Sequence, residues 1–322
     1  MSSILNTLLA IMLVLTACGC FLVGINLMSK GFVQATINRQ DGFLTRGFRA
    51  RNRFAGVGSG LLYTILSQSS DVTSVTLVRL ADLGIITLMQ ACACIIGANI
   101  GTTVTTFIVS LSAYNLTPFF AFFAFIGAIP LLSKKRKLKI FGQIVAGFGV
   151  LFIGLQLLQA NIENDAFRSL VNTLFNSTIN PLILVGIAVS MTMIVQSSSV
   201  VTSMVVFLIS GTLLPLESAL CLVVGANIGT CITSWIASIG SSKTARQTAM
   251  FHTFFNIVGA AIFMAVMYTP IKEPFFNLVK AIKITAEFKV ALFHLLFNLM
   301  AAMVMIPLLR PAVWVCKKII RH

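Results

Sequence analysis

The chain has 322 residues, of which 57% are hydrophobic and only 10% are charged, and its mean hydropathy is +0.98. A soluble domain usually carries about 25% charged residues, so a chain this apolar is predicted to be an integral membrane protein with the lipid bilayer as its first partner. Its net charge of +15 does not indicate nucleic acid, because the basic residues lie between apolar stretches, where they set topology and meet anionic lipid headgroups.

The first part of the chain predicts a span, a re-entrant hairpin and two further spans. Residues 4–27 are apolar, follow no basic segment and are too long for a signal peptide, so we expect a retained span. Residues 54–80 are too polar at their centre for a plain span, which suggests two half-helices that meet at a polar tip. Two further spans, at about 83–110 and 118–132, complete a first repeat over residues 1–137.

The same order of elements then restarts. The second repeat, residues 138–270, contains a span, a re-entrant hairpin and two spans, at about 140–159, 181–213, 216–238 and 248–268. A polar loop at about 161–180 precedes the hairpin. Residues 271–322 add an amphipathic connector, a last span and a basic tail. The predicted fold class is an all-α polytopic membrane protein built from two repeats.

A duplicated polar motif marks the same two points in both repeats. Gln68-Ser69-Ser70 is followed 29 positions later by the segment GANIGT, and so is Gln196-Ser197-Ser198, with 128 residues between the copies. The duplication in an apolar chain is typical of a transporter site built on discontinuous helices, so we expect one interrupted helix in each repeat. The glycines of GANIGT also have GxxxG spacing, which on its own more often indicates close helix packing.

The distribution of basic residues predicts the orientation of the chain. If residues 30–53 and the loops on their side are cytoplasmic, 17 lysines and arginines lie inside and five outside. Each repeat has three full spans, an odd number, so the second repeat is predicted to be inverted and the hairpins to enter from opposite sides. The tail is then cytoplasmic and the protein is a multi-pass component of the cell (inner) membrane. This count requires residues 270–289 to lie at the interface; if they span, the tail moves outside.

The two hairpin tips have the chemistry of an anion site beside cation ligands. A broken helix exposes backbone N–H groups at the start of its second half, and these groups and the helix dipole favour an anion. The Gln-Ser-Ser side chains add hydroxyl donors and an amide, and Ser197, Ser198 and Ser199 can point hydroxyls at phosphate oxygens without a fixed positive charge. Oxygen atoms suit Na⁺, a hard ion. The side-chain oxygens that could hold it belong to Gln68, Gln196, Asn99, Asn227, Thr102 and Thr230.

Asp71 is the one residue that differs between the tips, because the second tip has Ser199 at this position. An acid at membrane depth is costly and is a functional candidate by default. Asp71 could bind Na⁺, carry a proton, or pair with Arg79 two turns along. We also note that serine and threonine in membrane helices often only bond back to their own backbone.

Two further patterns have simpler interpretations. The motif F-H-x-x-F-N occurs at residues 251–256 and again at 293–298, and we favour interhelical hydrogen bonds that dock the last two spans over contact with a substrate. The seven cysteines form no CxxC pair and lie mostly in apolar helices. They are expected to be small hydrophobic residues rather than metal ligands or disulfides.

These motifs resemble the type II sodium–phosphate cotransporter family, in its bacterial branch, over nearly the whole chain. The resemblance implies Na⁺-driven uptake of inorganic phosphate by alternating access between inverted repeats, with the two tips holding phosphate near the midplane. Carried over to this sequence, the resemblance implies a phosphate site at Gln68, Ser69, Ser70, Gln196, Ser197, Ser198 and Ser199. It implies further sodium ligands just after the tips, at Thr73, Ser74, Thr202 and Ser203. Asp71 departs from the family's Gln-Ser-Ser-Ser tip, and its carboxylate would repel the anion unless protonated or bound to a cation. Many bacterial relatives also carry a PhoU-like C-terminal domain, which this chain is expected to lack.

Two alternatives stay open. One is a sodium- or proton-coupled carrier of a different anion, with Asp71 as the cation or proton site. The other is an ion channel, although a channel needs a continuous polar pore and this polarity is concentrated at two tips. An enzyme is not expected, because nothing in the sequence brings a nucleophile such as Ser199 to a base such as His252. No cofactor is expected beyond sodium as the coupling ion, and a homo-oligomer is left open.

Overall fold

The structure is a computed structural model that describes residues 2–37, 43–50, 52–114, 117–159, 168–169, 171–172 and 180–321. Within these ranges every regular element is a helix and no strand occurs, which confirms the predicted all-α class. Arg39, Arg51 and most of the predicted polar loop at 161–180 lie outside the described residues.

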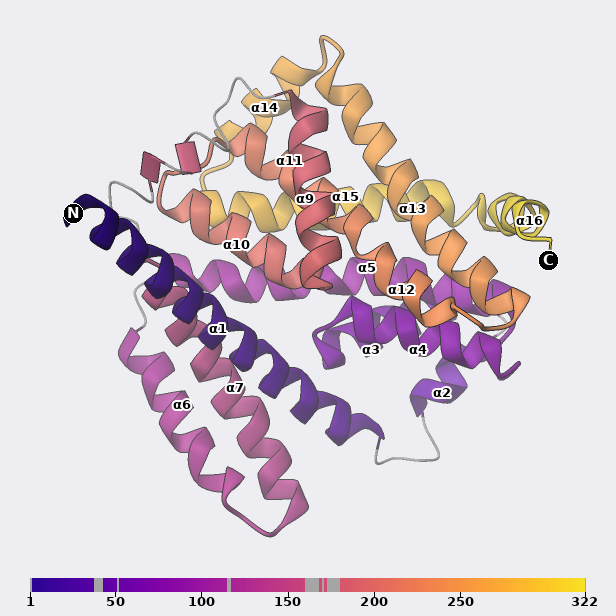
Figure 1. The fold of residues 1–322 in the computed structure, drawn as a ribbon. Coiled ribbons are helices and arrows are strands. Elements are labelled where there is room, and N and C mark those ends of the chain that lie inside the picture. Colours follow the sequence, from indigo (N-terminus) through magenta and orange to yellow (C-terminus); the bar gives the residue numbers. More distant parts are fainter. Residues whose placement is uncertain are drawn as a thin grey trace.

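The helices follow the predicted order closely (Figure 1). They are α1 (Ser2–Ile37), α2 (Phe43–Phe48), α3 (Arg53–Ser67), α4 (Ser70–Asp82), α5 (Leu88–Ser110), η1 (Leu111–Ala113), α6 (Thr117–Leu131), α7 (Arg136–Gln159), α9 (Pro181–Val195), α10 (Ser198–Ser210), α11 (Leu216–Gly229), α12 (Cys231–Ser238), α13 (Lys243–Met267), α14 (Lys272–Ala281), α15 (Ala286–Met305) and α16 (Leu309–Ile319). Six stretches of the described chain are long and apolar enough to cross a membrane, at Leu15–Phe32, Leu88–Ala113, Arg136–Leu157, Leu216–Ser238, Lys243–Met267 and Ala286–Met305. The expected span at 118–132 is not among them, because α6 has only 15 residues.

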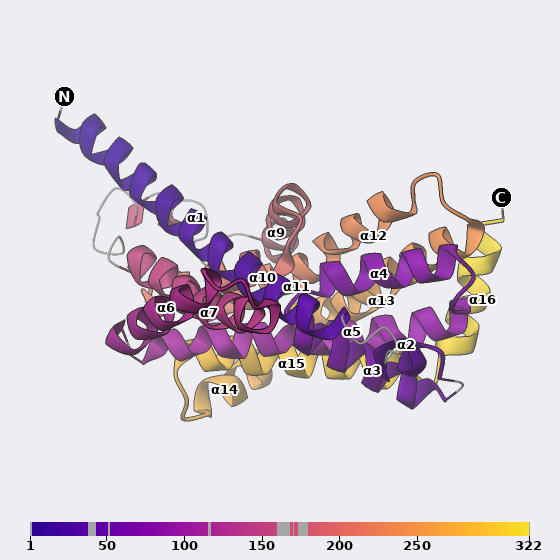
Figure 2. The ribbon, with the colours of Figure 1, turned by 90° about the horizontal axis from the view of Figure 1, so that it is seen from below.

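Helices α1, α6 and α7 form a layer of their own beside the rest of the molecule (Figure 1), and the N-terminal end of α1 projects beyond it (Figure 2). Glycines let α1 and α7 touch. A Cβ added at Gly24 would lie 2.2 Å from the backbone nitrogen of Leu151, and one at Gly154 would lie 2.4 Å from that of Phe21. These residues belong to similar short sequences in the first span of each repeat, so the similarity marks a close contact between the two spans.

The two hairpins are built from helices too short to cross a bilayer. Helices α3 and α9 have 15 residues each, and α4 and α10 have 13 each, which is roughly 20 Å per helix. A hydrocarbon core is about 30 Å thick. Each pair breaks at its tip, Gln68 or Gln196, where the sequence predicted the break, and its two helices contact each other. Their re-entrant course in a membrane stays a prediction.

The GxxxG glycines pack each hairpin against a long helix. A Cβ at Gly97 of α5 would lie 1.8 Å from the carbonyl oxygen of Val57 in α3, and one at Gly225 of α11 would lie 2.3 Å from that of Val185 in α9. Both contacts are offset by 128 residues, so the two repeats use the same packing. Helix α5 runs through its glycines without a break. The interruption expected there is absent, whereas the second copy ends α11 at Gly229 and begins α12 at Cys231.

The hairpins approach α13 from its opposite ends. At the base of the first hairpin, the Ser242 backbone N–H, just before α13, donates to Asp82 Oδ1 at 2.6 Å. At the start of the second, Tyr268 Oη, just after α13, donates to Asn180 Oδ1 at 2.6 Å. Helix α13 has 25 residues, or about 37 Å. This is the arrangement that inverted repeats would give, although their inversion across a membrane stays a prediction.

The basic connector and the basic tail lie on the same side of the molecule. Arg53 Nη1 donates to the carbonyl oxygen of Ile306, beside the start of α16, at 3.1 Å. Gln247 Nε2 donates to the carbonyl oxygen of Ile320 at 3.0 Å. Helix α14 has 10 residues, about 15 Å, which is too short for a span. Helix α14 therefore does not span, while the interfacial position of residues 270–289 and the assignment of this side to the cytoplasm stay predictions.

Candidate functional site

The duplicated tips have almost the same backbone. Gln68 has φ 52° and ψ 24°, and Gln196 has φ 55° and ψ 30°. The next residues, Ser69 and Ser197, are extended, with φ −151° and −154° and ψ 112° in both. A left-handed conformation is uncommon outside glycine and is held by surrounding structure. The same sequence therefore interrupts the helix with the same backbone conformation in both repeats, and a new helix begins directly after each interruption.

The first tip is engaged by the helix beside it. Gln68 is 4% exposed, its Oε1 accepts a hydrogen bond from Thr105 Oγ1 of α5 at 3.2 Å, and its Nε2 donates to the carbonyl oxygen of Ile65 at 2.5 Å. Ser69 Oγ accepts from the backbone N–H of Val72 at 3.2 Å and so caps α4. Both polar ends of the Gln68 amide are thus satisfied, which fixes the side chain.

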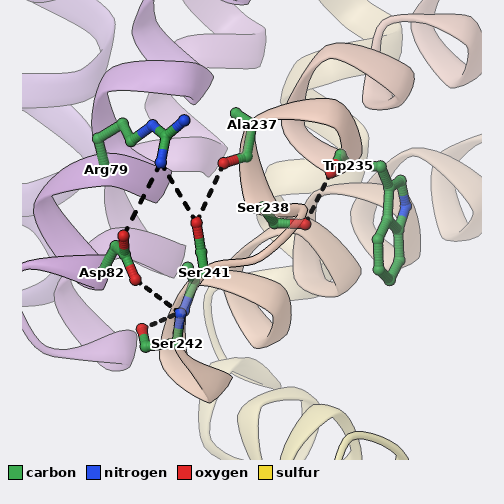
Figure 3. A network of polar contacts seen from close by, with 8 residues as sticks. Arg79, Asp82, Trp235, Ala237, Ser238, Ser241 and Ser242 are labelled. Atoms are coloured by element: carbon green, nitrogen blue, oxygen red, sulfur yellow. Dashed lines mark hydrogen bonds and ion pairs between the residues drawn. The ribbon is translucent and has the colours of Figure 1, made fainter.

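Asp71 joins the first tip to the second repeat. Thr233 Oγ1 of α12 donates to Asp71 Oδ1 at 3.2 Å, while Asp71 Oδ2 is inaccessible to solvent and finds no hydrogen-bond partner among the described residues. The pairing with Arg79, one of the three alternatives for Asp71, is not formed. Arg79 Nη1 instead lies 3.9 Å from Asp82 Oδ2 and 3.3 Å from Ser241 Oγ (Figure 3). Arg79 is in the last turn of α4, whereas Asp71 is in its first turn. An unpaired buried carboxylate oxygen is costly, so a cation or proton is the natural complement.

The second tip is not engaged in the same way. Gln196 is exposed, and Ser197 makes no side-chain cap. Ser198 and Ser199 are 1% and 2% exposed, yet their hydroxyls, like that of Thr192 nearby in α9, find no partner in the described part of the chain. Buried polar groups in proteins are nearly always bonded, so each exception calls for an explanation. Two free hydroxyls at the N-terminus of α10 can donate to the oxygens of an anion.

The other predicted sodium ligands are buried and donate their hydrogens to their own helices. The donors and their carbonyl acceptors are Thr73 to Ser69, Ser74 to Asp71, Asn99 to Ile95, Thr102 to Ala98, Thr202 to Ser198, Ser203 to Ser199, Asn227 to Val223 and Thr230 to Ala226. This is the back-bonding expected of hydroxyls in apolar helices. A hydroxyl that donates in this way still keeps lone pairs for a cation. The role of these side chains in sodium binding stays a prediction.

The two F-H-x-x-F-N helices dock on equivalent positions of the two repeats. His294 Nδ1 of α15 is 2.8 Å from Thr106 Oγ1, and His252 Nδ1 of α13 is 2.8 Å from Ser234 Oγ, where Ser234 follows Thr106 by 128 positions. The interpretation as interhelical hydrogen bonds is confirmed. His252 therefore bonds Ser234 rather than Ser199, the partner that an enzyme would need.

Sequence reasoning missed the threonines that hold the first tip. Thr105 and Thr233 are themselves related by the 128-residue offset, and each lies three residues after a GANIGT segment. Both donate to the first tip, to Gln68 and Asp71 respectively. Extending the alignment of the repeats past GANIGT would have found them.

Together these features define a polytopic membrane protein whose two halves share a broken-helix hairpin with a polar tip. The chain belongs to the Na+/Pi-cotransporter family, whose profile matches residues 20–160 and again residues 154–288. The double match supports the duplication that the sequence and the glycine contacts show. This is a family of transporters rather than of enzymes.

Sequence similarity to individual proteins is consistent with this family. The chain is 23% identical over 316 residues to YjbB of Salmonella typhimurium, which is named as a candidate inorganic phosphate export protein. The match covers 98% of this chain and 56% of YjbB. It is 26% identical over 292 residues to YqeW of Bacillus subtilis, covering 89% and 91% of the two chains. A segment of 130 residues is 34% identical to human sodium-dependent phosphate transport protein 2B, covering 38% of this chain and 18% of that protein. No solved structure matches.

Proposed function

We propose that this protein is a secondary transporter that couples inorganic phosphate to Na⁺ across the cell membrane. The observation that carries the proposal is a pair of buried hydroxyls, on Ser198 and Ser199, that find no partner among the described residues. They lie at the N-terminus of α10, directly after the helix break that both repeats share. Membership of the family supports phosphate and sodium as the transported ions.

The chemistry of the tips suits a phosphate that is held without a fixed positive charge. Hydroxyl and backbone N–H donors at the starts of α4 and α10 would bind its oxygens, with the candidate residues Gln68, Ser69, Ser70, Gln196, Ser197, Ser198 and Ser199. Sodium bound nearby would offset the charge of the anion, and the anion would in turn favour sodium. That mutual stabilisation is the physical basis of coupling.

The unequal engagement of the tips supports alternating access. The first tip is tied to both repeats through Thr105 and Thr233, while Gln196 of the second tip is exposed. A carrier must release one side of its site while it closes the other. We propose that the structure represents one such state, in which the second tip is less constrained than the first.

The direction of transport would follow the gradients. An inward sodium gradient would drive uptake of phosphate, which is the direction we propose. The relative YjbB is named for export, and a reversible carrier runs outward when the phosphate gradient exceeds the sodium gradient.

Transport in proteoliposomes tests the proposal. Labelled phosphate should accumulate under an inward sodium gradient and should not when choline replaces sodium. Gln196→Ala should abolish accumulation, whereas Ser190→Ala, on the exposed side of α9 with its hydroxyl bonded to Gly186, should leave it unchanged. No uptake above empty vesicles, with an active control transporter in parallel, would overturn the phosphate assignment.

Asp71 favours one alternative, a carrier of another tetrahedral oxyanion or one driven by protons. Its free Oδ2 atom could take a proton as readily as a sodium ion. Asp71→Ser, which makes the first tip match the second, separates the possibilities. A changed sodium dependence or charge per cycle supports a sodium site, and loss of proton-driven uptake in choline supports a proton site. If both stay the same, Asp71 serves only to position Thr233.

A further inference from the structure

A cavity lies far from the tips, where the first hairpin begins. It has a volume of about 500 Å³ and is lined by Asn52, Arg53, Met89, Pro307, Leu309 and Arg310. Two of these six residues carry a positive charge and none is acidic. Arg53 begins α3, and Gln68 follows the end of that helix, so about 22 Å of helix separates the cavity from the first tip. The cavity is therefore separate from the candidate transport site.

Hydrogen bonds position two of the polar side chains in this cavity, Arg53 and Asn52. Arg53 Nη1 donates to the carbonyl oxygen of Ile306 at 3.1 Å, which leaves its other guanidinium donors available. Asn52 Oδ1 accepts from the Phe54 backbone N–H at 2.9 Å and caps α3. Arg310 comes from the first turn of α16, next to the buried Leu309. The held Arg53 and the exposed Arg310 both offer guanidinium donors, which can bind the oxygens of a phosphate group in pairs.

The surroundings of the cavity are those of a membrane surface. Helix α16 lies crosswise to α15, which runs across both views while α16 is seen end-on in Figure 1 and upright in Figure 2. It buries one side, including Val313 and Cys316, and exposes the other. Trp314 is 60% exposed with Lys318 Nζ 4.9 Å from its ring centroid, and Phe54 is also 60% exposed. Exposed aromatic and basic residues on an amphipathic helix are typical of the headgroup region.

We propose that this cavity binds the phosphate headgroup of an anionic phospholipid. The two arginines supply the charge complement, and Met89, Pro307 and Leu309 supply an apolar part of the lining that suits the start of the acyl chains. A lipid, rather than phosphate from solution, is favoured because exposed aromatic and basic side chains follow the two arginines on their helices, at Phe54, Trp314 and Lys318. The connector and the tail, which both carry excess basic charge, meet at this point, so a bound lipid would join the start of the first hairpin to the C-terminal helix.

The test measures thermal stabilisation of the purified protein in neutral detergent. Dioctanoyl phosphatidylglycerol, dioctanoyl phosphatidylcholine and inorganic phosphate are titrated separately. We expect only phosphatidylglycerol to raise the apparent Tm in a saturable way. Its apparent Kd should weaken about fivefold in Arg310→Gln and about thirtyfold in the double variant Arg53→Gln/Arg310→Gln, from roughly 1 kcal/mol per basic residue.

A matched control separates the cavity from general charge. Lys134→Gln/Lys135→Gln removes the same two charges from an exposed loop that is predicted to lie on the same side of the membrane, and it should keep wild-type affinity. The exposed Arg310→Gln variant tests the cavity even if the double variant folds poorly. Equal stabilisation by phosphatidylcholine, full stabilisation by inorganic phosphate, no stabilisation by phosphatidylglycerol, unchanged affinity in Arg310→Gln or an equal loss in the lysine control would each overturn the proposal.

Discussion

The two hairpin tips have the same backbone and different surroundings. At the first tip, Gln68 is buried and bonded to Thr105, and Ser69 caps its helix. At the second, Gln196 is exposed, Ser197 makes no cap, and the hydroxyls of Ser198 and Ser199 have no partner within the described chain. Matching φ and ψ values show that local sequence decides where each helix breaks. The packing of the neighbouring helices decides which tip is held.

This difference teaches how one duplicated motif can serve a cycle. If both tips were held by hydrogen bonds, movement would have to break equivalent contacts on both sides at once. Here the first tip is held at Gln68 and Asp71 by threonines from the two repeats, and the second has free donors. The free donors are the ones that a ligand could satisfy, so binding and movement would concentrate at the second hairpin.

The largest expected effect on stability tests the close glycine contact that both hairpins share. Gly97→Ala and Gly225→Ala should each destabilise the protein by about 3 kcal/mol, because the new methyl group meets the carbonyl of Val57 or Val185. Gly58→Ala, on the open side of α3 where nothing lies within 4 Å, should be neutral or stabilising by up to about 1 kcal/mol. Thermal melting in detergent measures all three. Equal melting of Gly58→Ala and Gly97→Ala would show that the close contact is not what holds the hairpin.

The second effect separates binding from stability at the tips. Ser198→Ala and Ser199→Ala remove hydroxyls that have no partner, so the Tm should stay the same or rise slightly. Phosphate uptake should lose apparent affinity roughly ten- to hundredfold, as expected when a hydrogen bond to a charged ligand is lost. The paired measurement is uptake at several phosphate concentrations with melting of the same preparation. A lower Tm with normal uptake would show that these hydroxyls are structural.

Much of the fold could be predicted because it depends on local sequence. The tip at Gln-Ser-Ser, the order of the helices and the docking of His252 and His294 all follow from motifs and apolar length. The unbroken α5 could not be predicted, because Gly97 and Gly101 are equally consistent with a helix break and with close packing, and only the position of α3 decides. Likewise, nothing local to Asp71 points to Thr233, which lies 162 positions away.

A smaller effect compares the caps of the two tips. Ser69→Ala should destabilise the protein by about 1 kcal/mol, because Ser69 Oγ accepts the hydrogen bond of the Val72 N–H at the start of α4. Ser197→Ala should cost close to nothing, since Ser197 makes no such bond. Melting of the two variants side by side measures the difference. An equal cost at both positions would mean that the second tip also closes its cap in solution, and the contrast between the tips would then disappear.

The smallest expected effect concerns the contacts that join each hairpin to an end of α13, and at the first hairpin it depends on pH. The Ser242 backbone N–H, more than the nearby Arg79, lowers the pKa of Asp82 below its usual range (Figure 3). A carboxyl with a lowered pKa stabilises the fold above about pH 4, its unfolded value, and loses that contribution as the pH falls through the folded pKa. Asp82→Asn should therefore lower the Tm slightly at pH 7, and the gap to wild type should shrink as the pH drops below 4.

Two controls decide what holds each base. Arg79→Gln should change the Tm less than Asp82→Asn does, because an exposed pair at 3.9 Å contributes little. A drop in Tm as large as that of Asp82→Asn would show that the ion pair with Arg79, and not the hydrogen bond from the Ser242 N–H, holds this end of the hairpin. At the second hairpin, Tyr268→Phe removes the hydrogen bond to Asn180. Because this bond involves no carboxyl group, the effect of this change should be the same from about pH 3 to pH 7. Suppose that the stability contributed at the start of α13 by Asp82 depends on pH, and that the one contributed at its end by Tyr268 does not. The two repeats, alike in packing, would then be anchored to α13 by different chemistry.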